Sequence, residues 1–399
     1  MNSERLNRSV DAAVVGGGPA GLTTAIGLAR AGLQTLLIAP PAPVDPRTTA
    51  LLGASVELLE DYGVWSHVAE IAAPLSVMRL IDDTGRLVRA PEVAFDAREL
   101  DLPTFGYNVL NDALNNALDA VAASTPGLTR LMAKATAVHP GPDAVVIDTD
   151  AGPVTARVAV AADGSRSLAR TAAGIDLRTW SYPQSALVTT FSHERPHLDE
   201  SVEFHRPAGP FTVVPLKGNR SSLVWVETPD EARRLADLPK AELEAEIETV
   251  SHGLLGPVVI DGPVATIPLG GHVAKSFGAR RVALVGEAAH RFPPIGAQGL
   301  NLSLRDVRDL VATLKDAHAR GEDPGSDATL AAYHGRRRVD VVSRTLGVHA
   351  LDKSLLSGFL PVQVARGLGL TLAANVGTIR RFMMRRGLGE GLRRKIANG

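Results

Sequence analysis

Residues 10–21, VDAAVVGGGPAG, combine a short apolar strand with a glycine-rich turn. The next segment, Leu22–Ala31, has helical apolar spacing and stops at Gly32, a residue favoured just after a helix. The apolar run Leu33–Ala39 then predicts a second strand. This order is a βαβ unit that opens with Gly-x-Gly-x-x-Gly. Because such glycines let the backbone approach a pyrophosphate at a helix N-terminus, we expect a Rossmann-like dinucleotide-binding unit here.

The second predicted strand lacks a residue that such units usually carry. An Asp or Glu at its end normally holds the ribose hydroxyls. Here the strand ends in Ala39-Pro40-Pro41, and the nearest acid is Asp45. Three alternatives follow: the backbone or water holds the ribose, Asp45 reaches back to it, or the site is degenerate.

Composition limits the classes of protein that fit. The 399 residues are 45% hydrophobic and 21% charged, as in soluble globular proteins, and allow two domains or one large one. The net charge of −1 gives no reason to expect nucleic acid as a partner. There is no cysteine, which excludes disulfides and thiolate metal sites. The eleven histidines show no paired metal-ligand spacing, so we expect no metal.

A second strand-to-turn junction lies in the C-terminal half. The apolar run Val282–Val285 predicts a buried strand, which stops at Gly286-Glu287. A turn with Pro293-Pro294 follows, and an amphipathic segment begins near Gly299. The free N–H groups and the positive dipole at this helix N-terminus favour an electron-rich ligand.

The remaining pattern suggests how the chain is divided. A third strand, Val154–Ala161, ends in Asp163-Gly164, and short β-like runs dominate Gly174–Pro268. We expect an α/β protein with a Rossmann-like domain, a β-rich substrate domain and a C-terminal helical segment. The predicted boundaries are 1–71, 100–178 and 274–330 for the first, 72–99 and 179–273 for the second, and 331–399 for the third.

Several spaced motifs resemble one family over nearly the whole chain. The sequence is similar to the class A flavin monooxygenases related to para-hydroxybenzoate hydroxylase, and within them to the ubiquinone-biosynthesis hydroxylases. The resemblance rests on residues 16–21, 45–51, 105–107, 161–164 with 167, 286–290, 296–302 with 304–306, and 333 with 336–338 and 340.

The resemblance implies roles for individual residues. Arg47, His290 and Pro293 are expected at the reacting centre. FAD is expected to contact a larger set: Gly16, Gly18, Ala20, Gly21, Arg47, Asp163, Gly164, Gly286, Glu287, Gly296, Ala297, Gln298, Gly299, Leu300 and Asn301. Glu287 departs from the family's usual Asp, but it keeps the pair of acceptor oxygens.

The resemblance also implies a reaction. NAD(P)H would reduce FAD, O2 would add at the flavin C4a to give a hydroperoxide, and an aromatic ring would take one oxygen. The expected substrate is a polyprenylated phenol of ubiquinone biosynthesis. Other flavin chemistry, a halogenase or a prenyl reductase, is an alternative, although no Trp-x-Trp-x-Ile-Pro motif is present. A lipid-binding scaffold subunit without flavin is another, and Ala39 favours it.

Several of these residues also fit ordinary structural roles. His290 would equally suit a hydrogen-bonded turn, which we favour over substrate deprotonation. Pro293 and Pro294 either present a backbone carbonyl to the phenol of the substrate or only stiffen the turn. Trp180 and Trp225 are more typical of core than of a substrate pocket.

The C-terminal tail interleaves arginines with Phe382, Met383 and Met384. A basic amphipathic helix of this kind fits an anionic membrane surface, and a solvated basic face is the alternative. On sequence alone we favour the solvated face, but the resembled family acts on substrates with polyprenyl tails, which implies peripheral contact with the inner membrane surface. No signal peptide is seen at the N-terminus, so we expect a cytoplasmic protein. A biosynthetic complex and a homo-oligomer are both left open as partners.

Overall fold

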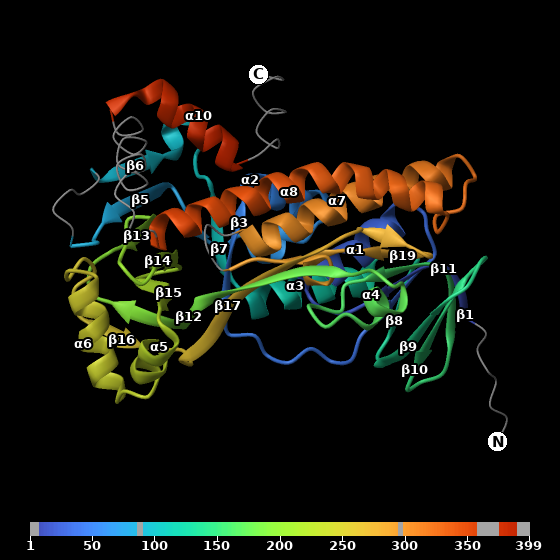
Figure 1. Ribbon diagram of the computed structural model, residues 1–399, viewed down its shortest axis with the longest axis horizontal. Coiled ribbons are helices and arrows are strands. Elements are labelled where there is room, and N and C mark those ends of the chain that lie inside the picture. Colours follow the sequence, from blue (N-terminus) through green and yellow to red (C-terminus); the bar gives the residue numbers. More distant parts are fainter. Residues whose placement is uncertain (1–7, 86–90, 294–297, 357–374, 389–399) are drawn as a thin grey trace.

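The computed structural model describes residues 8–85, 91–293, 298–356 and 375–388. Two large sheets and a small one make up its β-structure, with helices against the first sheet and at the far end of the second (Figure 1). The α/β architecture with a C-terminal helical segment is therefore confirmed, whereas the residue boundaries of the three predicted domains stay a prediction.

The first sheet has eight strands, in the order β18-β19-β11-β1-β2-β8, with β10 and β9 extending from β11. Its strands β19, β11, β1, β2 and β8 pair in parallel. The bounds are β1 Arg8–Val15, β2 Thr35–Ile38, β8 Leu128–Leu131, β9 Ala135–Pro140, β10 Val145–Thr149, β11 Val154–Ala161, β18 Gly278–Ala279 and β19 Val282–Leu284.

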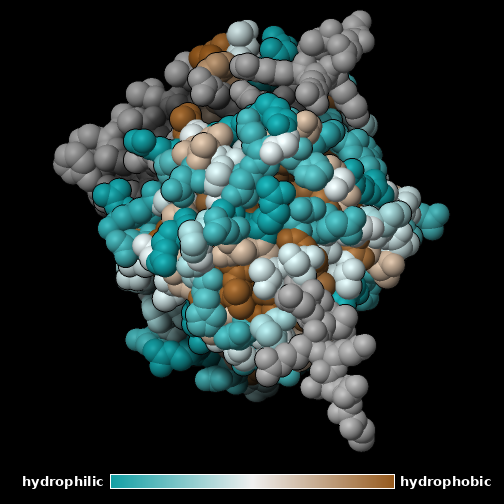
Figure 2. All heavy atoms as spheres, turned by 90° about the vertical axis from the view of Figure 1, so that its right-hand side faces the viewer, coloured by the Kyte–Doolittle hydropathy of each residue, from teal (hydrophilic) through white to brown (hydrophobic). Residues whose placement is uncertain are grey.

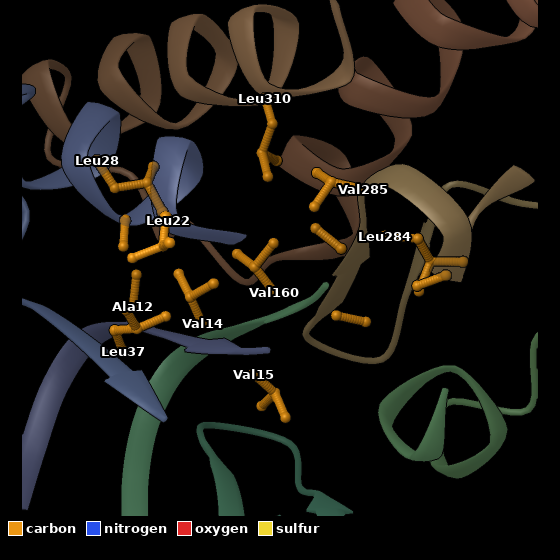
Figure 3. Close-up of a cluster of buried hydrophobic side chains, with 14 of the residues drawn as sticks. Ala12, Val14, Val15, Leu22, Leu28, Leu37, Val160, Leu284, Val285 and Leu310 are labelled. Carbon is orange, nitrogen blue, oxygen red and sulfur yellow. The ribbon is translucent and has the colours of Figure 1, made fainter. Parts of the chain in front are cut away.

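Helices cover this sheet and bury its apolar strands. They are α1 Pro19–Arg30, α3 Asn111–Ser124, α4 Leu168–Ala172, α7 Gln298–Ala319 and α8 Asp327–Leu356. Helix α7 packs on α1, and α8 packs on α7 (Figure 1). Figure 3 shows the resulting core, in which Leu22 and Leu28 of α1 and Leu310 of α7 face Val14 of β1 and Val160 of β11. All five side chains are at most 1% exposed, as expected for a parallel sheet whose faces are covered.

The second sheet has nine strands, in the order β20-β17-β12-β15-β14-β13-β5-β6, with β16 beside β12. Most of its pairs are antiparallel. The bounds are β5 Val77–Asp82, β6 Val93–Asp96, β12 Leu177–His193, β13 Glu200–His205, β14 Pro210–Leu216, β15 Arg220–Glu227, β16 Val258–Ile260, β17 Ala265–Ala274 and β20 His290–Arg291. Helices α5 Pro229–Ala236 and α6 Lys240–Val250 lie at its far end (Figure 1).

A small antiparallel sheet joins the two large ones. It contains β3 Thr48–Leu52, β7 Gly106–Leu110 and β4 Ala73–Pro74. The Asn108 side chain donates to the Pro215 carbonyl (2.9 Å), and the Thr48 hydroxyl donates to Ser222 Oγ (3.0 Å). These contacts hold the second sheet against the segment that follows β2.

The remaining elements are helix α2 Gly53–Asp61, the 3-10 turns η1 Trp65–His67, η2 Ala97–Leu100 and η3 Gly286–Ala288, and helix α10 Gly377–Leu388. Within the described residues, no helix is both long and apolar enough to cross a membrane. Figure 2 views the end of the molecule formed by the first sheet, where the surface is mainly hydrophilic with scattered apolar residues.

Most predicted elements match the structure, and two do not. Strands β10 and β11 and helix α6 have the predicted bounds. The apolar spacing of Leu131–Val138 predicts one strand, but β8 ends at Leu131 and β9 begins at Ala135. Residues Arg47–Leu51 are predicted to lead directly into a helix, yet β3 forms there because β7 supplies a distant pairing partner, with Ala50 opposite Asn108.

Candidate cofactor site

The three glycines of the first turn meet different surroundings. A Cβ on Gly16 would lie 2.2 Å from the Ala162 carbonyl oxygen, and one on Gly21 would lie 2.0 Å from the Gly16 oxygen. Gly16 also has φ +117°, which other residues rarely adopt. A Cβ on Gly18 would meet nothing within 4 Å. Gly16 and Gly21 therefore permit close packing, and Gly18 leaves open space in front of α1.

The N-terminus of α1 suits an anion. Gly18 is its N-cap and has no side chain to cap the helix, and Pro19 occupies the first turn, as is common at helix starts. No acidic residue lies in that turn. The first N–H groups of α1 thus remain available to a phosphate, with a favourable helix dipole.

Asp163 provides a second feature that a ligand would complete. Its Oδ2 accepts from the backbone N–H groups of Leu168 (2.7 Å) and Ala169 (3.3 Å), which orders the start of α4. Its Oδ1 is buried and has no hydrogen-bond partner among the residues that the structure describes. The next residue, Gly164, has φ +79° and open space at its Cβ position. A buried acceptor beside open space fits a ligand that carries hydroxyl or N–H donors.

The turn after β19 is held by side chains from three other segments. The Gly286 N–H donates to Asp306 Oδ2 (3.0 Å), His272 Nε2 donates to the Glu287 carbonyl (2.8 Å), and Arg170 Nη1 donates to the Ala288 carbonyl (3.0 Å). Burial lowers the pKa of His272, which favours its neutral ring with the proton on Nε2. The Glu287 side chain is exposed, and its Oε2 accepts from Ser165 Oγ (2.8 Å). The turn thus presents one carboxylate from a fixed backbone.

A buried ionic network lies behind this turn. Asp306 is fully buried and accepts from His290 Nε2 (2.6 Å) and Arg337 Nε (2.7 Å), as well as from Gly286. One helical turn earlier than Arg337, the Tyr333 hydroxyl donates to the Leu284 carbonyl (2.7 Å). Helix α8 therefore fixes both the end of β19 and the turn that follows.

The three turns lie side by side at one edge of the first sheet. Val15, Ala161 and Leu284, the last residues of β1, β11 and β19, are paired across the strands. A Cβ on Gly286 would lie 3.1 Å from Ala20 Cβ, which places the third turn against the first. Nucleotides bind at this carboxyl edge in α/β sheets, so the edge is the candidate cofactor site.

The structure shows what surrounds Ala39 at the end of β2 and what Asp45 binds. Ala39 is buried, and a Cβ on Gly17 would lie 2.7 Å from Ala39 Cβ. The Asp45 carboxylate accepts from Arg47 Nε (2.8 Å), Arg47 Nη2 (2.7 Å) and Asn111 Nδ2 (2.9 Å). Burial alone would raise the pKa of Asp45, but the hydrogen bonds from Arg47 and Asn111 lower it, so the carboxylate stays ionised.

The predicted residues near α7 differ in their surroundings. Asn301 is 3% exposed, and its amide bonds to the Leu52 N–H (2.8 Å), the Ser55 hydroxyl (2.7 Å) and the Ala50 carbonyl (2.7 Å). It therefore fixes β3 and α2, and these bonds do not point to a cofactor. Leu300 packs on the main core, and Gly299 has open space at its Cβ position.

For the other predicted residues between β20 and α7, the structure gives burial or position but no contact with a cofactor. Gly296 and Ala297 lie outside the described residues, and Gln298 is described only as the first residue of α7. Pro293 is buried. His290 has a fully buried side chain, so its surroundings favour the structural alternative, and a role in the reaction stays a prediction. Trp225 lies in the core of the second sheet.

Comparison with known proteins identifies the cofactor of the family to which the chain belongs. Residues 9–346 match the FAD binding domain family. The chain belongs to this FAD-binding family. Among its relatives, ubiquinone hydroxylase UbiL of Rhodospirillum rubrum is 36% identical, with 96% of this chain and 90% of that protein covered. The 3-demethoxyubiquinol 3-hydroxylase of Escherichia coli is 34% identical, with 96% and 99% covered.

Solved structures share the fold of this FAD-binding protein. The p-nitrophenol 4-monooxygenase PnpA of Pseudomonas putida superposes with a TM-score of 0.77 at 21% identity, covering 94% of this chain and 97% of that one. PqsL of Pseudomonas aeruginosa superposes with a TM-score of 0.73 at 23% identity, covering 91% and 100%.

The residues present fit FAD. Open space at Gly18 and the free α1 N-terminus suit its pyrophosphate, while Glu287 and the unpartnered Asp163 oxygen suit its hydroxyl groups. Sequence reasoning did not assign roles to Ser165, Arg170, His272 or Arg337, which orient these groups. Arg337 alone of the four belongs to a motif noted for the resemblance, at 336–338, and Ser165 lies between Gly164 and Ser167 of another.

Proposed function

We propose that this FAD-binding protein is an NAD(P)H- and O2-dependent hydroxylase of an aromatic ring, acting on a polyprenylated phenol in ubiquinone biosynthesis. The observation that carries the proposal is the fixed Gly286–Glu287 turn beside the open Gly18 loop. The chain is related over nearly its full length to a ubiquinone hydroxylase and to a 3-demethoxyubiquinol 3-hydroxylase. Bound FAD would supply the oxygen activation, and the protein would bind, orient and shield the reactants.

The described side chains suit this division of work. Gly18 and the α1 N-terminus would hold the pyrophosphate, and Glu287 and Asp163 would accept hydrogen bonds from hydroxyl groups of the cofactor. Helix α7 starts at Gln298, and the positive end of its dipole would stabilise negative charge. The second sheet, attached through Asn108 and Thr48, would limit the access of water.

The purified protein tests this function in two steps. A yellow preparation that releases FAD on heating rules out a scaffold that has lost flavin. We then expect NADH or NADPH oxidation to rise with a phenol from a panel with and without polyprenyl chains, together with O2 uptake and a product heavier by one oxygen. Reduction of a prenyl double bond without O2 uptake would instead indicate a prenyl reductase. Failure of both nicotinamides to reduce the bound FAD would contradict the proposal.

Helix α10 supports the expected membrane contact. Its inner side is anchored by Arg380 Nε, which bonds both Glu99 carboxylate oxygens (2.9 Å each), and by Met384, which packs in a cluster with Leu100. Its outer side exposes Phe382 (60%) and Met383 (41%), with Arg381 and Arg385 also exposed. Apolar side chains between exposed arginines suit an anionic lipid surface.

Vesicle binding tests this contact. Each arginine near such a surface contributes about 1 kcal/mol, so Arg381→Glu/Arg385→Glu should weaken binding to phosphatidylglycerol vesicles by more than about tenfold. Phe382→Ser/Met383→Ser should weaken binding to the same vesicles. Lys217→Glu, an exposed charge reversal on the β14–β15 turn, is the control and should leave binding unchanged. Equal binding by all four proteins in a sedimentation assay would reject the contact.

A further inference from the structure

Glu287 stands where the resembling family usually has the shorter Asp, and the structure shows a contact that matches its extra length. Oε2 of Glu287 accepts from Ser165 Oγ at 2.8 Å. Ser165 lies directly after the Asp163-Gly164 turn, 122 residues away in sequence. One carboxylate oxygen is therefore engaged by the neighbouring turn.

A buried arginine sets the spacing between these two turns. Arg170 is 6% exposed, and its guanidinium donates from Nη2 to the Ser165 carbonyl (3.0 Å) and from Nη1 to the Ala288 carbonyl (3.0 Å). The planar guanidinium thus joins the backbones of both turns at a fixed separation. The hydrogen bonds of Arg170 to both backbones therefore help to hold Ser165 within hydrogen-bond distance of Glu287.

The Glu287 carboxylate also interacts electrostatically with Arg47. The hydrogen bond with Asp45 is the main cause that raises the pKa of Arg47, and the Glu287 carboxylate adds to this rise. With Oε2 bonded to Ser165, Oε1 remains to accept from a ligand.

We propose that Ser165 is a positioning residue for cofactor binding: its hydroxyl holds Oε2 of Glu287, so that the longer side chain presents Oε1 to the hydroxyl groups of FAD. A shorter Asp at position 287 would draw back by one methylene and lose Ser165. The inference rests on the proposed placement of FAD against Glu287.

A double-mutant cycle on FAD affinity tests this pairing without relying on turnover. The dissociation constant of FAD is measured by flavin fluorescence on the apo forms of the parent, Ser165→Ala, Glu287→Asp and the double variant. Without this hydrogen bond the Glu287 side chain must be ordered when FAD binds, which predicts roughly a tenfold weaker FAD affinity for Ser165→Ala in the parent. In the Glu287→Asp background the same change should have no effect. Ser165→Thr, which keeps the hydroxyl, should retain most of the affinity.

The controls separate this inference from the proposed site. Ser66→Ala removes another exposed hydroxyl, outside the candidate site, and should leave FAD affinity unchanged. The apo forms of the parent, Ser165→Ala and Ser66→Ala should have the same melting curve. An equal effect of Ser165→Ala in both backgrounds would overturn the pairing. The pairing would also be overturned if Ser165→Ala kept the FAD affinity of the parent while Glu287→Ala bound FAD poorly. In that case the proposed placement of FAD against Glu287 would still stand. Normal FAD affinity in Glu287→Ala would instead overturn the placement of the cofactor itself.

Discussion

Gly18→Val should yield a folded protein that no longer binds FAD. The backbone at Gly18 has φ −77° and ψ 176°, which valine adopts without strain, and no atom lies within 4 Å of the added Cβ. The valine would instead occupy the space in front of the α1 N-terminus. Losing two hydrogen bonds to a pyrophosphate costs about 3 kcal/mol or more, which corresponds to at least a roughly hundredfold weaker FAD affinity.

Gly21→Val is the matched variant, because its Cβ would lie 2.0 Å from the Gly16 oxygen. We expect it to lower the melting temperature of the apo protein, whereas Gly18→Val should leave that temperature nearly unchanged. The comparison uses apo forms because bound FAD itself stabilises the fold. The ratio of absorbance at the flavin band to that of the protein gives the FAD content. Full FAD content in Gly18→Val would contradict the placement of the pyrophosphate.

Arg337→Met should destabilise the protein strongly. Arg337 is 1% exposed and pairs with Asp306 (2.7 Å), Asp309 (2.8 Å) and Asp340 (3.0 Å). Burial opposes its charge, but these carboxylates keep its pKa above the ordinary value. Methionine would leave Asp306 buried without its cation, which costs about 3–5 kcal/mol of the free energy of unfolding. Urea denaturation of the apo protein measures this change.

The preceding residue supplies the control for this variant. Arg336 is about half exposed and lies 3.6 Å from Asp316, a contact typical of weak surface ion pairs. Arg336→Met should therefore change the free energy of unfolding by less than about 0.5 kcal/mol. Equal stabilities of the two variants would show that the buried network contributes little. Reduced FAD affinity in a folded Arg337→Lys would link the network to the Gly286 turn.

Local sequence patterns were sufficient for most of the first sheet. Val10–Ala39 specifies β1, α1 and β2 because strand and helix periodicities alternate there, separated by glycines. Strand β3 could not be predicted in the same way, since its pairing with β7 depends on a segment far along the chain.

For individual residues, the sequence identified candidates, but it did not show what their side chains contact. Motif spacing identified Asp163, Gly164 and Glu287 as candidates, because these residue types directly follow apolar strands. It could not show that Asn301 bonds to Ala50, Leu52 and Ser55, or that His290 is buried on Asp306. Side-chain direction and burial depend on neighbours that only the fold brings together.

The βαβ unit and the three strand-to-turn junctions follow from the amino-acid sequence, because each depends on residues close together in the chain. The FAD-binding family follows from the order of motifs along nearly the whole chain. Only the tertiary structure placed those junctions at one sheet edge and joined them through Arg170, Ser165 and Asp306. Hydrogen bonds between distant segments leave no local periodicity in the sequence from which they could be predicted. They form only after the parallel strands bring Val15, Ala161 and Leu284 into register.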